Sequence, residues 1–329
     1  MNGLPWPAGS ATGIGSLPGT DIIEAVKTVF GELPDFPFLP ELPARGPGAD
    51  MIGRSAGLLT DLPVELYAAR WQLATHPGRD ARRTADLWER DLDAMADQAA
   101  GYTGTVKTQS TGPWTLSAHL DLRTGGPVLR DPGAVRDLTN SLAEGLRAHV
   151  ARLAARVPGG RLLVQLDEPA LPAVLGGDLP TESGLGRLPA VDRATVVSHL
   201  RAVVDAVGVP VLVHCCAPRA PVDLLRKAGA VAVALDLDVV TDLDGLGAEL
   251  DAGLGLLAGA VPARGRSAPA GAAAVERLQR LWRQLGFPEE RLVGQVVVTQ
   301  SCGLADATPD YARAALAAAR AAGRRLAGA

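Results

Sequence analysis

Apolar residues recur in two alternating patterns from about residue 80 to the end of the chain. Short, continuously apolar runs predict strands buried on both faces, and runs with an apolar residue every three or four positions predict amphipathic helices. The predicted strands cover residues 104–109, 162–166, 209–213, 230–235, 253–261 and 292–298. The predicted helices cover residues 80–100, 193–207, 221–228, 243–250 and 277–285, with two more beginning at Asp131-Pro132 and Thr308-Pro309.

The region before residue 80 is less regular. Residues 13–20 form a glycine-rich turn that opens a helix, with Thr20 or Asp21 as its N-cap and an apolar face beginning at Ile22. Residues 34–64 contain too many prolines for a long helix and predict a loop-rich crossover.

Alternating strands and helices over this length predict an α/β fold. The specific expectation is a (β/α)₈ TIM barrel that forms a single domain over residues 1–329, because barrels of this kind often reach such a length as one domain. An open, doubly wound parallel sheet is the alternative.

Polar and reactive side chains follow several of these strands where each strand ends. In a parallel barrel the carboxyl ends of the strands meet on one face, where functional groups gather. We therefore expect one imidazole, several carboxylates and two or three thiols to converge there. These residues are Asp167, Glu168, His214, Cys215, Cys216, Asp236, Asp238 and Cys302.

Nitrogen, sulfur and oxygen donors of this kind predict a zinc site. Side chains alternate along a strand, so His214 and Cys216 share one face and are assigned to the metal. Cys215 points the other way and is expected to pack as a small apolar side chain. Asp236 fits either a metal ligand or a helix N-cap. A redox site is a weaker interpretation because no Cys-x-x-Cys pair is present.

Composition narrows the classes of partner. Hydrophobic residues make up 47% of the chain and charged residues 21%, which allows a large core. The net charge of −4 and the absence of a basic run argue against nucleic-acid and anionic-membrane partners. The chain shows no secretory signal and no membrane-spanning run, and its three cysteines are too few for a disulfide framework. A cytoplasmic location is expected.

Five short motifs, in this order and across nearly the whole chain, resemble the catalytic C-terminal barrel of the cobalamin-independent methionine synthases. Each motif is unspecific alone, but the ordered set is fairly specific. The motifs are Ile14-Gly15-Ser16-Leu17-Pro18, Thr111-Gly112-Pro113, Asp167-Glu168-Pro169-Ala170-Leu171, His214-x-Cys216 and Cys302-Gly303-Leu304.

The resemblance implies a zinc-dependent S-methyltransferase that methylates the thiol of homocysteine to form methionine. It implies zinc ligands at His214, Cys216, Asp236 and Cys302. It also implies that Ile14, Ser16 and Asp167 contact homocysteine, with Asp167 as the catalytic side chain that holds the amino group. The methyl donor would be of the methyltetrahydrofolate type or a methylcorrinoid.

The chain departs from the family pattern at several places. Asp236 stands where the family has Glu, with Asp238 as the fallback ligand. The family's His-Gly-Glu segment is missing, and Glu41 is the nearest carboxylate. The strand at residues 256–262 lacks the family's general-acid His. Two alternatives therefore stay open: a zinc-dependent transferase or lyase acting on another small thiol, and a catalytically silent zinc-binding barrel.

Overall fold

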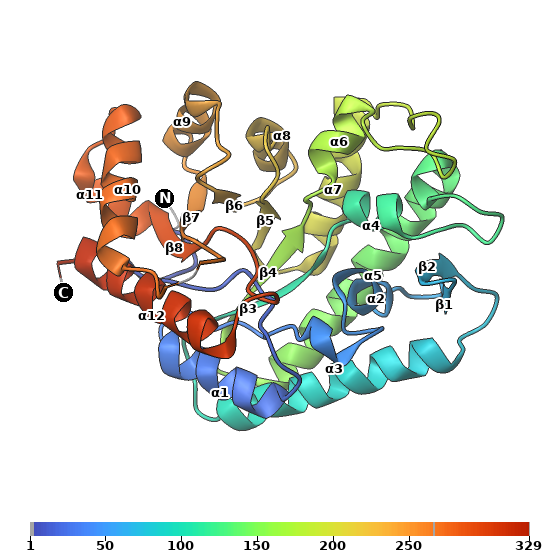
Figure 1. Cartoon of the computed structure of the whole chain (residues 1–329), viewed down its shortest axis with the longest axis horizontal. Helices are drawn as coiled ribbons and strands as arrows, with labels where there is room; N and C mark the ends of the chain where they lie inside the picture. The colour runs from blue at the N-terminus through green and yellow to red at the C-terminus, as the bar shows by residue number, and fades with distance from the viewer. Residues whose placement is uncertain (1–2, 266, 329) are drawn as a thin grey trace.

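A curled, parallel six-stranded sheet lies at the centre of the computed structural model, which describes residues 3–265 and 267–328 (Figure 1). Its strands follow one another in chain order, because each is joined to the next by a crossover that returns over the sheet. The strands are β3 (Thr105–Thr111), β4 (Arg161–Asp167), β5 (Val211–Cys215), β6 (Ala232–Asp236), β7 (Gly255–Val261) and β8 (Val296–Gln300).

Two extended segments near the N-terminus lie between the outer strands β8 and β3. Each is joined to its neighbours by isolated parallel bridges instead of a continuous ladder. The bridges are Ala11–Val298, Ser16–Glu41 and Phe38–Lys107. The structure therefore has six of the eight predicted barrel strands. Two bridging segments lie where the other two strands would complete the barrel.

Glycine and proline explain why these two segments are not regular strands. Pro37 and Pro40 cannot donate to a ladder. The first segment, around residues 11–16, passes very close to its neighbours. A Cβ atom on Gly13 would lie 2.3 Å from the Phe38 ring, and one on Gly15 would lie 3.0 Å from the side chain of Gln109. These segments therefore approach their neighbours closely but form few ladder hydrogen bonds.

Helices surround the sheet on its outer side (Figure 1). Among the described residues, no helix is long and apolar enough to cross a membrane. The longer helices are α1 (Ile22–Glu32), α3 (Arg79–Gln98), α5 (Pro132–Arg156), α7 (Arg193–Val207), α9 (Leu243–Asp251), α10 (Gly271–Gln284) and α12 (Pro309–Leu326). The shorter ones are α2 (Met51–Ala56), α4 (Pro113–His119), α6 (Leu171–Gly176), α8 (Val222–Lys227), α11 (Glu289–Gln295), η1 (Pro43–Arg45) and η2 (Val128–Arg130).

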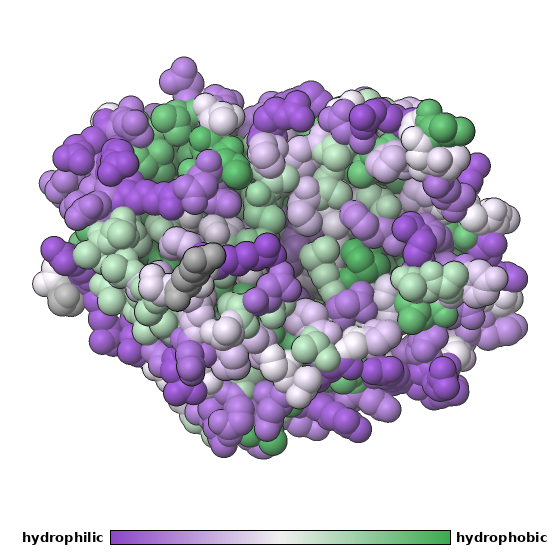
Figure 2. Space-filling view, in the orientation of Figure 1, coloured by the Kyte–Doolittle hydropathy of each residue, from purple (hydrophilic) through white to green (hydrophobic). Residues whose placement is uncertain are grey.

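The outer surface of this arrangement is mainly polar. Figure 2 shows hydrophilic side chains around most of the edge of the molecule, and a hollow near the centre of the same face. Apolar side chains are scattered between the hydrophilic ones on this face (Figure 2). Such a distribution is ordinary for a folded domain whose larger apolar surfaces are already buried.

Strand side chains alternate between two apolar clusters. The larger cluster fills the space between the sheet and the helices. The smaller one lies on the inner face of the curled sheet. Its buried members are Trp6, Ile14, Phe36, Leu163, Leu212, Ala232, Ala234, Leu257 and Val297. This alternation places His214, two positions after Leu212, on the inner face as well.

The structure confirms the helix starts, with Asp21, Asp131 and Thr308 each accepting backbone N–H bonds as N-caps. The predicted strand over residues 292–298 is wrong at its beginning, because α11 extends to Gln295. The first turn of α11 carries Glu289 and Glu290, whose negative charges favour a helix N-terminus. The sequence also missed α2 and the hairpin of β1 (Val64–Tyr67) and β2 (Arg70–Leu73) within or after the proline-rich crossover.

We predict that Gly145→Ala destabilises the protein whereas Gly31→Ala does not. A Cβ atom on Gly145 of α5 would lie 1.7 Å from the carbonyl oxygen of Leu58, whereas one on Gly31 of α1 meets nothing within 4 Å. Chemical denaturation should show the Gly145 variant losing about 1–3 kcal/mol of unfolding free energy. The Gly31 variant should be unchanged or gain up to about 1 kcal/mol. Equal effects would contradict this packing.

Candidate active site

Three of the four predicted metal ligands come together at the carboxyl ends of β5 and β8. His214 is the second-last residue of β5, Cys216 directly follows that strand, and Cys302 follows β8. Their ligand atoms all lie within 4.8 Å of one another. The two sulfur atoms are 3.4 Å apart. Residues 86 positions apart in the chain are thus brought together by the curl of the sheet.

The imidazole of His214 is held in one orientation. Its Nδ1 lies 3.1 Å from the carbonyl oxygen of Ala234 on β6, and a bond donated to that oxygen leaves Nε2 free to act as a ligand. Burial lowers the pKa of His214, but contact with Cys302 and the charge of Asp167 outweigh burial and raise the pKa overall. Negative charge on Cys302 and Asp167 therefore stabilises the protonated form of this ring.

The two thiols respond differently to this environment. The hydrogen bond with Cys216 and the contact with His214 lower the pKa of Cys302 to about 4. The same hydrogen bond, together with burial, raises the pKa of Cys216. One sulfur is therefore a thiolate near neutral pH, which is the form that binds metals.

The donor set fits a zinc ion. Two thiolates on a tetrahedral zinc lie about 3.8 Å apart, given Zn–S bonds of about 2.3 Å. The observed 3.4 Å separation is close to that value. One imidazole and two thiolates are a ligand set known from catalytic zinc sites, where a fourth position stays open for substrate.

Asp236, the fourth predicted ligand, is not part of this cluster. Its Oδ1 accepts a hydrogen bond from the backbone N–H of Asp238 at 2.9 Å, a local turn interaction. Burial raises the pKa of Asp236, and the charges of Arg277, Cys302 and His214 also act on it. The fallback Asp238 forms an ion pair with Arg277, and its side chain is 63% exposed. The geometry thus favours three protein donors over four.

Cys215 behaves as the sequence predicts. It is buried, and it lies outside the group of His214, Cys216 and Cys302. Burial raises its pKa to about 12, so its thiol stays protonated. It packs as a small apolar side chain.

The predicted homocysteine contacts lie next to the thiol cluster. Asp167 is buried and pairs with His214 across the β4–β5 ladder, and its Oδ1 accepts a bond from Gln165 Nε2 at 2.7 Å. The Ser16 carbonyl accepts a bond from Leu304 at 2.8 Å. A Cβ atom on Gly303 would lie 2.1 Å from Ser16 Oγ, so only glycine lets the loop after Cys302 pack against Ser16.

The sequence interpretation missed a buried lysine beneath these residues. Lys107 Nζ donates to the carbonyl oxygen of Ile14 at 2.9 Å and to Gln109 Oε1 at 3.1 Å. Burial lowers its pKa to about 7, against the opposing charges of Asp167 and Glu41. A signal was present in the sequence, because every residue of β3 except Val106 is polar, although the strand is buried at every position.

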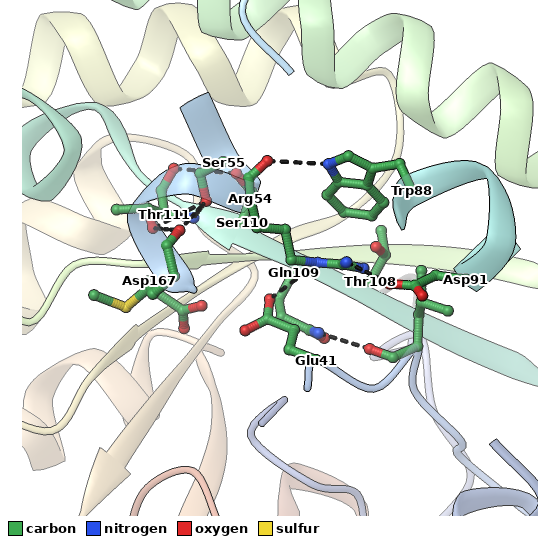
Figure 3. A network of polar contacts seen from close by, with 12 residues as sticks. Glu41, Arg54, Ser55, Trp88, Asp91, Thr108, Gln109, Ser110, Thr111 and Asp167 are labelled. Atoms are coloured by element: carbon green, nitrogen blue, oxygen red, sulfur yellow. Dashed lines mark hydrogen bonds and ion pairs between the residues drawn. The ribbon is translucent and has the colours of Figure 1, made fainter. Parts of the chain in front are cut away.

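Glu41 is another buried charged residue in this region. It bridges to Ser16 and lies 3.9 Å from the guanidinium of Arg54. Burial raises its pKa to about 7 despite that guanidinium. Figure 3 shows Glu41 and Asp167 in one polar network around β3. Glu41 is therefore a second buried carboxylate close enough to Asp167 for the two charges to act on each other.

Glu168 has a structural role. Its carboxylate accepts bonds from the backbone N–H groups of Trp114 at 2.9 Å and Thr115 at 2.7 Å, and so caps the first turn of α4. Burial nevertheless raises its pKa to about 7.

The fold and the strand-end cluster together define a parallel α/β enzyme with a thiol–imidazole active site. Residues 9–325 match the family model described as cobalamin-independent synthase, catalytic domain. The chain belongs to this family, the cobalamin-independent methionine synthases. It is therefore a methyltransferase that acts on homocysteine. No curated protein matches the chain.

Two solved structures are similar to this chain. A B12-independent methionine synthase from Shewanella sp. W3-18-1, in complex with selenomethionine, superposes with a TM-score of 0.63 at 12% identity, covering 98% of each chain. A GH113 β-mannanase from Alicyclobacillus acidocaldarius has a TM-score of 0.49 at 12% identity, covering 99% of this chain and 98% of its own. The first of these supports the fold of the methionine synthase catalytic domain.

We predict that the purified protein holds one zinc ion per chain and that Cys216→Ala and Cys302→Ala lose it. Each variant removes one of the two sulfur donors that lie 3.4 Å apart. Cys215→Ala is the matched control and should keep full zinc occupancy, because that thiol lies outside the cluster. Elemental analysis checks this. Zinc-free wild type, or equal loss in the Cys215 variant, would contradict the assignment.

We also predict that Glu168 makes a pH-dependent contribution to the free energy of unfolding. Its folded pKa of about 7 lies above its ordinary value of 4.5, so the folded state binds more protons between these values. The free energy of unfolding should therefore fall as pH rises through this interval, and Glu168→Gln should lack that contribution. Denaturation of both proteins at about pH 5 and about pH 7.5 measures it. A wild type that gains stability over the variant with rising pH would refute the assignment.

Proposed function

We propose that this protein is a zinc-dependent homocysteine S-methyltransferase that forms methionine. The observation that carries the proposal is the cluster of His214, Cys216 and Cys302, whose ligand atoms lie within 4.8 Å of one another. A zinc ion held by these three residues would favour the thiolate form of homocysteine over the thiol. That form is the nucleophile needed to attack a methyl group.

The chain's own residues would position the substrate. Asp167 would accept hydrogen bonds from the amino group, with the buried Glu41 as a second negative charge nearby. Ile14 and Ser16 would line the same end of the substrate. Because the Gly303 loop packs against Ser16, an amino acid bound there would have its thiol close to Cys302.

The identity of the methyl donor depends on which group supplies a proton. A tetrahydrofolate leaving group needs one, and the described β7 has no acidic side chain. At Gly259 no side chain fits, since a Cβ atom would lie 2.6 Å from the Leu235 carbonyl oxygen and 2.8 Å from Ser301 Cα. We nevertheless propose a donor of the methyltetrahydrofolate type, because the chain matches the cobalamin-independent family; its proton would then come from outside β7. A methylcorrinoid is the second candidate, because its cobalt leaves without a proton.

The test is a methyl-transfer assay with homocysteine and each donor separately, using wild type and Asp167→Asn. We expect methionine from one donor. We also expect the variant to raise the KM for homocysteine about tenfold or more with its zinc content unchanged, because it loses one charged hydrogen bond to the amino group.

Other outcomes would separate the alternatives. If zinc-loaded wild type methylates another small thiol but not homocysteine, homocysteine is not the acceptor and that other thiol is. Zinc-loaded wild type that transfers no methyl group from either donor would favour the catalytically silent barrel.

A further inference from the structure

Lys107 of β3 is a buried cation that the proposed reaction does not use. An ammonium group in a protein interior is costly unless hydrogen bonds and opposite charges offset its lost hydration. Lys107 is fully buried, and its Nζ donates to two uncharged oxygens, the carbonyl of Ile14 at 2.9 Å and Oε1 of Gln109 at 3.1 Å. The side chain is therefore fixed against the turn that carries Ile14, a predicted homocysteine contact.

The Ile14 carbonyl oxygen accepts a second hydrogen bond. Gln165 Nε2 donates to it at 2.8 Å and to Asp167 Oδ1 at 2.7 Å. A carbonyl oxygen has two lone pairs, so Lys107 and Gln165 together use both. Lys107 thus shares its acceptor with the side chain that orients Asp167, and it helps to fix the Ile14 turn relative to this carboxylate.

A second connection runs from Lys107 to Glu41. Gln109, which accepts a bond from Lys107, also forms a hydrogen bond that lowers the pKa of Glu41. Gln109 and Gln165 are register partners on β3 and β4. Lys107 is therefore linked, through Gln109 and through the Ile14 carbonyl, to both carboxylates proposed to face the amino group.

The charge of Lys107 acts on Glu41 without occupying its oxygens. Burial raises the pKa of Glu41 to about 7 against the charge of Arg54, and the charge of Asp167 raises it further. The charge of Lys107 lowers this pKa. In the described part of the chain Lys107 forms no ion pair. It therefore favours the ionised form of Glu41 and leaves the carboxylate to another cation.

One lysine does not cancel the negative charge of two carboxylates. Arg54, the other cation beside Glu41, is ion-paired with Asp91. Ionised Glu41 and Asp167 thus keep negative charge for the ammonium group of a substrate. A buried carboxyl group without a nearby cation takes up a proton instead, and then loses that attraction.

We propose that Lys107 is a positioning residue that makes the site selective for an acceptor thiol with an amino group. Its hydrogen bond fixes the turn that carries Ile14, and its charge keeps Glu41 ionised for the substrate's ammonium group. The inference rests on the proposed function, because that function supplies homocysteine as the acceptor.

The test measures the affinity of the purified protein for L-homocysteine and for deaminohomocysteine, the same thiol acid without its amino group. Calorimetry at about pH 6.5 and about pH 8 gives the preference, which is the ratio of the two dissociation constants and cancels the contribution of the thiol. The variants are Lys107→Met and Lys107→Gln. The control is Thr108→Val on the same strand, a buried residue whose hydroxyl lies 3.0 Å from His149 Nε2.

We expect wild type and Thr108→Val to prefer homocysteine by the same factor. Both Lys107 variants should lose about tenfold of that preference at about pH 6.5, through weaker binding of homocysteine alone. The loss should shrink at about pH 8. Lys107, whose pKa is about 7, is then mostly neutral in wild type, and Glu41 ionises without its help.

Three results would overturn the proposal. Equal weakening of both ligands in the Lys107 variants would show a purely structural role, and so would a loss of preference that does not change with pH. Tighter homocysteine binding in these variants would show that Lys107 repels the amino group.

The proposed function can fail separately. A wild type that prefers homocysteine but forms no methionine would sink that function and leave this inference standing. Methionine formation with unchanged preference in Lys107→Met would sink this inference alone, and a wild type without any preference would also overturn it.

Discussion

The parallel register of β4, β5 and β6 is the constraint on which the site depends. It sets Asp167 beside His214 and His214 beside Ala234, so one imidazole faces a carboxylate on one side and a backbone carbonyl on the other. A slip of one residue would turn His214 and Cys216 toward the helices and present Cys215 inward. The apolar residues Leu212, Ala232 and Ala234 oppose such a slip, because they would leave the inner cluster with it.

Burial gives the site its chemistry. Lys107, Asp167 and Glu41 are all buried, and their charges act on one another there. The pKa of Lys107 falls to about 7 and that of Glu41 rises to about 7, since each charged form loses its hydration. The hydrogen bond between the two thiols, in contrast, is what sets the pKa values of Cys216 and Cys302 apart.

Much of the fold and part of the site could be predicted from the sequence. Continuous apolar runs locate buried parallel strands, and period-two alternation alone separates Cys216 from Cys215. The closure near the N-terminus could not be predicted, because Gly13, Gly15 and Pro37 lie in segments joined by isolated bridges, which leave no strand pattern. The role of Lys107 was missed, since the Ile14 carbonyl that accepts its hydrogen bond and the carboxylates of Glu41 and Asp167 that act on it are distant in sequence. Asp236 is a different case. Its strand position left a metal ligand and a helix N-cap both open, the resemblance assigned it to the metal, and in the structure its carboxylate accepts a local turn bond from Asp238.

The central claim is that His214, Cys216 and Cys302 hold a zinc ion with a position open to the substrate's thiol. Zinc X-ray absorption of the purified protein, with and without homocysteine, tests this claim most directly. The account predicts two sulfur neighbours at about 2.3 Å in the free protein and three after homocysteine is added. A sulfur count that does not change on adding saturating homocysteine would contradict it.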